Sequence, residues 1–575
     1  MKRQILLIII SFFSIAIFAE EKEAGSYDRK SISYVNRILL LDNSVKNQMP
    51  PPYTHITLKG LKKTLLLERF DRNPLTEDFL TEFTAEIDRT LPNMSGNGGK
   101  VMDSISAVMN RTIVPKIVSI VEASKKVRAE LLLTEQQKNS FITDKAKEVG
   151  VTADELNRVM NSAYLFLPFV RNYSDRSNKK EGTYSVSLDI GVMIWKISVA
   201  GDSAKAIPLM RKVMTGTGSS RINGSYLYKG SSVGYREYAF RQLLNEVNMN
   251  LEVAVKEVEA FKLRSQITED HGLTVKFDLG KKAGIRVNDK FFIMRNIEMP
   301  DGSIVQKKGG WVRVTKVGTR EKTETSKAAI VGGRPSIGSE IKEYPRIPMD
   351  FTLKGRNYKL DIENSKTYSH INVKTRDAWG PELQISTDIG RYVRVPQLYL
   401  GVEAGFGFGG YYGTVKNNST VENNSTVIEK DGNYYMISYD VSITKKFFFR
   451  RVGLVLDPAF GGQYLVFSGA DIKTYSDTLQ TEWVNNTIGF IPRGGVEVAI
   501  MPFLNVGAIF GYQFFIENNI WFYKEKDKTD DKAKWEDKNL GSIDPMVNSD
   551  GFIMHFYVTA SFPRLPGNLF NKNKK

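Results

Sequence analysis

The stretch LYLGVEAGFGFG, residues 398–409, alternates large apolar side chains with small or polar ones over consecutive positions. Side chains of a β-strand point to opposite faces in turn, so the two sets separate completely. The polar face carries Glu403, and the apolar face is formed by Leu398, Leu400, Val402, Ala404, Phe406 and Phe408. A strand with one apolar and one polar face is typical of a membrane barrel, in which lipid lies on one side and a polar interior on the other.

The same alternation recurs through the last part of the chain. It gives eight strand candidates, at residues 351–362, 382–390, 397–409, 433–447, 452–467, 485–499, 504–516 and 551–562. Short connections alternate with long polar ones, which cover residues 363–381, 410–432, 468–484 and 517–550. An even strand count with short periplasmic turns and long external loops is typical of bacterial outer-membrane barrels. Residues 347–575 are therefore predicted to form an eight-stranded antiparallel β-barrel. A soluble sandwich or lipocalin-like barrel is the alternative, because alternation alone does not identify the outer solvent.

The two faces of these strands predict a sealed barrel interior. The inward positions include Glu403, Asp440, Arg493 and Glu497, which we predict to form an interior charge network. Because an eight-stranded barrel is only wide enough for its own side chains, we expect paired charges and no wide pore. The outward positions are apolar and would be an aggregation hazard in water. They are Leu400, Val402, Phe406, Phe408, Ile437, Tyr439, Val441, Ile443, Val496, Val498, Val506, Phe510, Phe552, Met554, Phe556 and Val558.

The N-terminus predicts export from the cytoplasm. Lys2 and Arg3 precede an apolar run at residues 5–18, and Ala19 is followed by charged residues. This order is that of a secretory signal peptide, residues 1–19, cleaved after Ala19. An uncleaved anchor is the alternative, although the run is short for a membrane-spanning helix.

Composition restricts the chemistry. The 575 residues contain no cysteine, which excludes disulfides, thiolate metal sites, cysteine nucleophiles and an N-terminal lipidated cysteine. The chain has 80 basic and 64 acidic residues, and without Lys2 and Arg3 the balance is 78 − 64 = +14. Anionic lipid head groups, lipopolysaccharide or cell-wall polymer would match this charge, and solubility alone would also explain it. Export argues against nucleic acid as the partner.

The part before the barrel is predicted to hold three domains. Residues 20–175 show helical apolar stripes, including Phe83 and Ile87, and capping boxes at residues 134–137 and 152–155, the second opening a helix that includes Leu167. They predict a helical periplasmic domain, with helices between residues 31 and 169, followed by a polar linker at residues 171–182.

Residues 176–268 are predicted to form an α/β domain and residues 269–346 a small β module. The first has strand-like alternation at Tyr184, Val186 and Leu188 and an amphipathic helix at residues 239–258. Its Gly- and Ser-rich segment, residues 201–233, is assigned no structure. The second has short strand-like runs between Gly-Gly and Pro-Asp-Gly turns. The fold class is therefore multidomain α+β, with an N-terminal helical domain, an α/β domain, a small β module and a C-terminal eight-stranded antiparallel β-barrel.

Two stretches resemble known envelope proteins. The order of strands, Gly/Ser-rich connection and long helix in residues 183–262 is similar to the domain shared by the curli-secretion channel subunit and the flagellar outer-ring protein. Residues 284–291, GIRVNDKF, and 311–314, WVRV, are similar to the small C-terminal domain of the flagellar protein. The curli subunit is a lipoprotein and builds its pore within that domain, whereas this chain lacks the cysteine and has separate membrane strands. The resemblance implies envelope assembly or secretion, and no site residue is carried over.

Catalytic constellations are not found in the sequence. The four histidines, His55, His271, His370 and His555, have no metal-ligand spacing, and His555 falls among the barrel-interior positions. The glycines at residues 405–410 lie within a strand pattern and do not lead into a helix, so they do not form a nucleotide loop. We predict no catalytic, cofactor-binding or metal-binding residues and no enzyme activity.

Three functions remain to be compared. The first is a non-enzymatic outer-membrane protein whose periplasmic domains scaffold or assist an envelope assembly or secretion machine, with outer-membrane lipid and envelope proteins as partners. The second is a surface-binding, adhesin-like protein that acts through loops 410–432 and 517–550. The third is a soluble periplasmic enzyme with an unusual β domain. The sequence does not give the oligomeric state.

Overall fold

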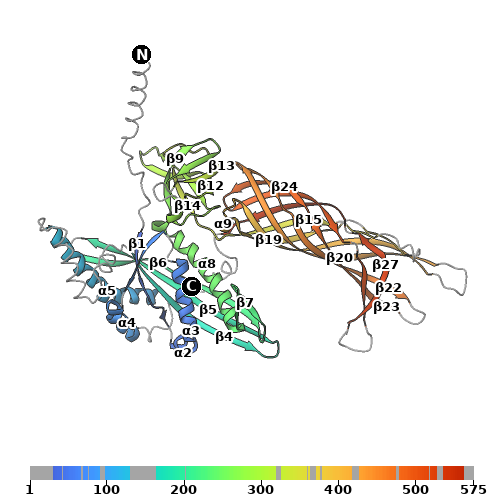
Figure 1. Cartoon of the computed structure of the whole chain (residues 1–575), viewed down its shortest axis with the longest axis horizontal. Coiled ribbons are helices and arrows are strands. Elements are labelled where there is room, and N and C mark those ends of the chain that lie inside the picture. Colours follow the sequence, from blue (N-terminus) through green and yellow to red (C-terminus); the bar gives the residue numbers. More distant parts are fainter. Residues whose placement is uncertain are drawn as a thin grey trace, which may run out of the picture.

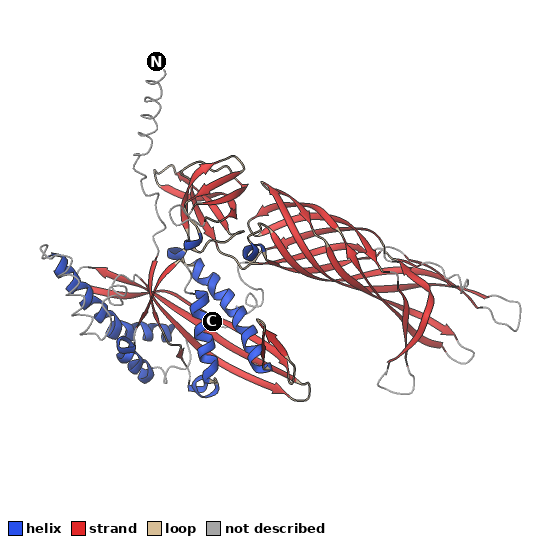
Figure 2. Cartoon of the chain, viewed as in Figure 1, coloured by secondary structure: helices blue, strands red, loops and turns tan. Residues whose placement is uncertain are grey.

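The computed structural model describes residues 30–562 except for a few segments. These are residues 42, 66–68, 76, 91–97, 130–163, 201–202, 319–324, 359, 363–370, 376–377, 418–425, 474–477, 517, 527–534 and 549. The predicted signal peptide and both predicted capping boxes lie outside the described residues. The described chain forms a sheet flanked by helices, a small closed barrel and a large ring-like sheet (Figures 1 and 2).

The first unit is a mixed sheet in the order β3-β1-β4-β5-β6. Its strands are β1 (Lys30–Val35), β2 (Leu39–Leu40), β3 (Phe70–Leu75), β4 (Tyr164–Asn178), β5 (Thr183–Ala200) and β6 (Ser203–Arg221). β1 runs parallel to β3 and β4, β2 runs parallel to β4, and β4, β5 and β6 are antiparallel.

Helices cover both faces of this sheet. One apolar core includes α2 (Asn43–Gln48), α3 (Pro51–Leu65) and α8 (Tyr235–Glu257), and the other includes α4 (Glu77–Thr90) and α5 (Gly98–Ala129). A short hairpin, β7 (Tyr226–Tyr228) and β8 (Ser231–Val233), precedes α8, and η2 (Glu259–Phe261) follows it. Among the described residues, no helix is both long and apolar enough to cross a membrane.

The prediction of helices between residues 31 and 169 is correct for α3, α4 and α5 and wrong for β1, β3 and the start of β4. Leu167, assigned to a helix, lies in β4 among neighbours that are all buried. A strand buried on both faces loses its alternation and cannot be told from a buried helix by period. The predicted linker at residues 171–182 is also wrong, because β4 pairs with β5 as far as Asn178 and Thr183. The predicted boundary at 175/176 therefore falls inside one sheet.

The glycines that gave no prediction have a packing role in β6. Gly216 and Gly218 lie under α8, and a Cβ atom at Gly218 would be 1.9 Å from the carbonyl oxygen of Ala239. The helix therefore approaches the strand to a distance that only glycine permits. The first half of α8 packs on the sheet because these two side chains are missing.

The second unit is a small closed barrel in the order β10-β13-β12-β11-β14-β9. Its strands are β9 (Arg264–Asp270), β10 (Thr274–Phe277), β11 (Lys290–Glu298), β12 (Ile304–Lys316), β13 (Ser326–Gly332) and β14 (Glu340–Tyr344), with η3 (Lys281–Ala283) between β10 and β11. A buried ion pair joins it to the first unit. Arg69 Nη1 donates to Glu343 Oε2 at 2.6 Å and to the carbonyl oxygen of Phe261 at 3.1 Å, and Nη2 donates to Glu343 Oε1 at 2.9 Å.

The third unit is an antiparallel sheet that closes into a ring through the pairing of β19 with β20. Its elements are β15 (Met349–Tyr358), β16 (Asp361–Ile362), β17 (Ile371–Thr375), β18 (Ala378–Asp388), α9 (Gly390–Val393), β19 (Leu398–Asn417), β20 (Thr426–Phe449), β21 (Val452–Leu456), β22 (Ala459–Lys473), β23 (Thr478–Ile491), β24 (Arg493–Met501), β25 (Leu504–Phe515), β26 (Asn518–Lys526), β27 (Trp535–Asn548) and β28 (Gly551–Ala560). Each of the eight strand candidates coincides with strands of this sheet.

The predicted long loops are shorter than expected. β19 and β20 stay paired as far as Asn417 and Thr426, and β26 and β27 form a hairpin inside the predicted loop 517–550. Strand pairing uses backbone groups, so it continues through polar sequence after the apolar alternation has ended. Figure 1 shows these strands continuing beyond the regular part of the ring.

We expect Gly218→Ala to lower the stability of the first unit by about 1–3 kcal/mol, because the new methyl group must displace the backbone of α8. Gly234→Ala, at an open position before α8, should cost less than about 1 kcal/mol. Hydrogen exchange of α8 and β6 in the full-length protein measures both effects. Equal protection in the two variants would show that α8 can move away without cost.

Candidate functional site: the interior and mouth of the large barrel

The third unit, the closed ring of strands, is called the large barrel from here on. A network of buried ion pairs fills its centre. Arg493, the first residue of β24, donates to Glu403 through Nη1 at 3.0 Å and through Nη2 at 2.7 Å. The same guanidinium lies 2.9 Å from Asp457 Oδ2 and 3.5 Å from Asp440 Oδ1. One cation thus joins carboxylates from β19, β20 and the turn between β21 and β22. The structure places the predicted residues Glu403, Asp440 and Arg493 together.

Two further cations complete this central cluster. Lys354 Nζ donates to Glu403 Oε2 at 2.7 Å, and Arg356 Nη1 donates to Glu382 Oε2 at 2.9 Å. The side chains of Lys354, Arg356 and Glu382 are each at most 2% exposed. These three residues were not predicted from the sequence to belong to the network. The signal was present, because Thr352, Lys354 and Arg356 alternate with outward residues along β15.

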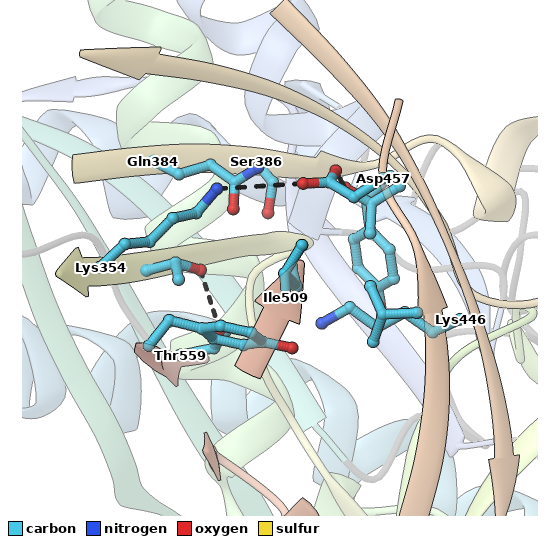
Figure 3. Close-up of a pocket in the computed structure, with 12 residues that line it drawn as sticks. Lys354, Gln384, Ser386, Lys446, Asp457, Ile509 and Thr559 are labelled. Carbon is cyan, nitrogen blue, oxygen red and sulfur yellow. Dashed lines mark hydrogen bonds and ion pairs between the residues drawn. The ribbon is translucent and has the colours of Figure 1, made fainter. Parts of the chain in front are cut away.

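Glu497, the fourth predicted residue, lies in a separate cluster. It accepts hydrogen bonds from Lys446 Nζ at 2.6 Å, Asn505 Nδ2 at 2.9 Å and Tyr557 Oη at 3.1 Å. A cavity of about 20 Å³, lined by side chains of both clusters, lies between them. Figure 3 shows Lys354, Asp457 and Lys446 at its edge. Such a space is of the size of one water molecule.

Three carboxylates are close enough to suggest a metal site. Oxygens of Glu382, Glu403 and Asp440 lie within 4.8 Å of one another. Arg356, Lys354 and Arg493 reach these carboxylates directly, which supplies the positive charge that a metal ion would bring. His555 is buried beside them, with Nδ1 3.6 Å from Glu382 Oε1. The donor set therefore fits a salt-bridge network better than a metal centre.

The outer wall of the barrel is apolar where the interior is charged. Twelve of the sixteen outward positions are exposed in the structure, and Phe406, Val498, Val506 and Met554 are half-buried. Val402 is 60% exposed while its neighbour Glu403 is 1% exposed. A wall of this kind is stable in lipid and would associate in water.

The small barrel closes one mouth of the large barrel. Asn288 Nδ2 donates to Asp388 Oδ1 at 2.6 Å, and the backbone N–H of Gln397 donates to Asn288 Oδ1 at 2.8 Å. Arg391 Nη2 donates to Asp289 Oδ1 at 2.5 Å. Figure 1 shows the small barrel against the end of the large barrel that carries α9.

The buried charges of the large barrel are balanced only when this closure is included. Among the described residues between 349 and 562, seven buried carboxylates face four buried cations. The carboxylates are Asp350, Glu382, Asp388, Glu403, Asp440, Asp457 and Glu497, and the cations are Lys354, Arg356, Lys446 and Arg493. Three more buried cations come from outside the ring, namely Arg346, Arg313 and Lys290.

These three external cations sit at the mouth. Arg346 lies 3.2 Å from Asp350 and 3.3 Å from Asp388, and Arg313 Nη1 donates to Gln397 Oε1 at 2.6 Å. Lys290 donates to the carbonyl oxygen of Pro502. Burial, together with the nearby Arg346 and Arg313, lowers the pKa of Lys290. Buried carboxylates require such compensation, so the closure is part of the barrel's own electrostatics.

No protein-family model matches the chain, and no curated protein shows significant similarity to it. Solved structures to which it is similar are outer-membrane proteins. The surface protein NspA, a Neisserial protein, is 13% identical over 37% of this chain and 97% of that one, with a TM-score of 0.19. OprG from Pseudomonas aeruginosa is 8% identical over 38% and 97%, with a TM-score of 0.24. The outer-membrane protease OmpT from Escherichia coli is 9% identical over 38% and 95%, with a TM-score of 0.21. Values this low carry no conclusion about activity.

We expect Arg493→Leu to cost about 3–5 kcal/mol, because it leaves buried carboxylates without their cation. The double variant Arg493→Leu, Glu403→Gln should cost clearly less than the sum of the two single changes, since the pair is removed together. Urea unfolding in detergent, followed by tryptophan fluorescence, measures these values. Arg493→Leu combined with Glu497→Gln is the control and should be additive, because the two residues belong to different clusters.

Docking of the small barrel should weaken at acid pH. Burial alone would raise the pKa of Asp289, but Arg391, Lys256 and the backbone N–H of Arg286 outweigh it, and the pKa lies below the usual 3.8. A lowered carboxyl pKa stabilises the docked state above the free pKa, and this contribution is lost as the pH falls through the docked value. Spin labels at Ile337→Cys and Leu454→Cys should report a distance that broadens below a pH of about 4. In the Asp289→Asn variant the distance distribution should already be broad at neutral pH and should not change as the pH falls below about 4. A pH response equal to that of the unsubstituted protein would contradict the role of Asp289 in docking.

Proposed function

We propose that the chain is a non-enzymatic outer-membrane protein in which an eight-stranded barrel anchors a periplasmic scaffold for an envelope assembly or secretion machine. The observation that carries this proposal is the sealed barrel with a folded unit fixed to its mouth. A barrel whose interior is filled by ion pairs can anchor the protein in a membrane but leaves no open channel. We therefore assign the function to the two units that the barrel anchors.

The strand pairing supports eight membrane strands. β21 and β22 both pair with β20 and are separated by Pro458, and β23 and β24 are separated by Pro492. Each pair is one strand interrupted at a proline, which has no N–H for the ladder. β16, β17, β26 and β27 then extend strands of the ring beyond its apolar wall.

The joints between the units support a scaffold. Arg69 and Glu343 form a two-point ion pair that is almost completely buried, and Leu263 N–H also donates to Glu343 Oε2 at 3.1 Å. Breaking a buried pair of this type is expensive, so the first unit is held at a fixed angle to the small barrel. The small barrel is in turn fixed to the large one. Three units joined in this way present a rigid surface at the mouth side of the barrel.

A surface-binding function is the second candidate. The β19–β20 and β26–β27 hairpins extend the strands into both predicted binding loops, 410–432 and 517–550. Paired strands that extend beyond the apolar wall would project from the membrane, where an external ligand could be bound. This candidate places the activity at the other end of the barrel.

One experiment addresses both the orientation and the choice of function. The chain has no cysteine, so a single cysteine can be placed at Leu227, which is exposed on β7, or at Ser419, in the β19–β20 connection. In intact cells a membrane-impermeant maleimide should label Ser419→Cys only. Leu227→Cys should be labelled only after the outer membrane is permeabilised. Labelling of both sites in the soluble osmotic-shock fraction would overturn the proposal.

Cysteine-directed crosslinking in the same cells then locates the partner. The scaffold function predicts discrete crosslinked envelope proteins at Leu227→Cys and none at Ser419→Cys. The opposite result, with products at Ser419→Cys alone, would favour the surface-binding function. Replacement of residues 418–425 by Asn-Gly, a two-residue hairpin connection, is the matched control, because it shortens the β19–β20 connection and leaves the paired residues up to Asn417 and Thr426 in place.

A further inference from the structure

We infer that the β11–β12 hairpin of the small barrel is a binding surface for the phosphate head groups of the periplasmic leaflet. This inference rests on the proposed outer-membrane location. It assigns to the small barrel a role that closure of the mouth does not require, because the outer half of the hairpin makes no part of that closure.

The hairpin crosses the rim of the large barrel. At its inner end, Lys290 pairs in register with Arg313, and both are buried at the mouth. Two residues further on, Phe292 is opposite Trp311. Trp311 packs with Ala499 of β24, and Phe292 and Phe448 lie against the same cluster. The Phe292–Trp311 pair of the hairpin therefore lies at the edge of the large barrel's wall.

Beyond the rim the hairpin continues along the same line. The pairing runs over the seven residues from Phe292 to Glu298, and the six steps between them correspond to about 20 Å of strand. Next to Phe448, the neighbouring residues Phe449 and Val452 are exposed on the outer wall. A ribbon that passes from the mouth over this edge extends outside the wall, where the bilayer surface begins.

The outer half of the hairpin has the composition of a membrane-surface segment. Ile304 is 70% exposed, and Ile297 and Val305 are about two-fifths exposed. Four exposed basic residues accompany them, against the acidic residues Glu298 and Asp301. These are Arg295, Lys307, Lys308 and the nearby Arg334. Apolar side chains beside lysine and arginine match the boundary between acyl chains and anionic head groups.

The bulge in this hairpin orients one lysine toward the wall. The register shifts between Ile293 and Met294, where Gly309 is the extra residue of β12. Lys308 then lies over the ring of Phe292, with Nζ 4.2 Å from the ring centre. Its charge is thereby held at the rim, on the side of the hairpin that faces the barrel. Lys307 projects from the opposite face, so the two lysines flank the ribbon.

Spin labels on the full-length chain in lipid nanodiscs test this surface. Cysteine at Ile304 probes the hairpin, cysteine at Val402 probes the wall, and cysteine at the exposed Ala85 of α4 is the aqueous reference. In discs with phosphatidylglycerol, relaxation by oxygen and by a water-soluble nickel complex should show lipid contact at Ile304 and Val402 and water at Ala85. In discs of phosphatidylcholine alone, contact at Ile304 should weaken.

The outcomes separate the two proposals. Water exposure at Val402 overturns the outer-membrane anchor. Lipid contact at Val402 with water exposure at Ile304 leaves the anchor standing and overturns the head-group surface. If inorganic phosphate in detergent produces the same change at Ile304, the surface takes the free ion and the lipid assignment is overturned.

Charge variants identify the cause of the contact. Lys307→Gln with Lys308→Gln should lower the equilibrium constant for lipid contact of Ile304 by about fivefold for each lysine charge removed, which is about 1 kcal/mol of attraction near an anionic surface. Lys281→Gln with Lys282→Gln makes the same charge change on η3 and should leave that equilibrium constant unchanged. Equal loss in both variants would show that net charge, and not this hairpin, makes the contact.

Discussion

The guanidinium of Arg493 is the charge on which the interior of the large barrel depends. Burying an ion costs several kcal/mol, and this cost is offset only when partners meet it with good geometry. Glu403 and Asp457 do so from β19 and from the turn after β21, while Asp440 lies at a longer distance. Glu403 is also paired with Lys354 of β15, but Arg493 and Glu403 are 90 residues apart and meet across the interior only when β24 and β19 are both in the ring. This pair therefore links closure of the barrel to filling of its interior.

The same requirement for compensation extends to the mouth. Among its described residues the ring has more buried carboxylates than cations, and Arg346, Arg313 and Lys290 add buried positive charge at the mouth. Two of these belong to the small barrel, so the unit that closes the mouth also balances the charges behind it. The buried Arg69–Glu343 ion pair joins the small barrel to the first unit in the same way. A chain without disulfides thus fixes its units to one another by buried charge.

The strands of the large barrel were the most predictable part of the fold. Alternation between residues 398 and 409 survives in β19 because only one face of that strand is buried in protein. The N-terminal sheet was missed for the opposite reason. Leu165, Phe166 and Leu167 of β4 are all buried, so the period of two that marks a strand is absent. The glycines of β6 were visible in the sequence, but their purpose depends on the approach of Ala239, which no local pattern contains.

The candidate site shows the same division. That Glu403, Asp440, Arg493 and Glu497 face inward followed from alternation alone, because the face of a strand is a local property. Which of them meet was decided by the stagger between strands, and it placed Glu497 with Lys446 instead of with Arg493. The sequence by itself determined where the main strands of the large barrel lie and which of their side chains face its interior. Only the tertiary structure decided the ion pairs, the closure of the mouth by the small barrel and the position of its hairpin at the rim, since each depends on register and on contacts between residues far apart in the chain.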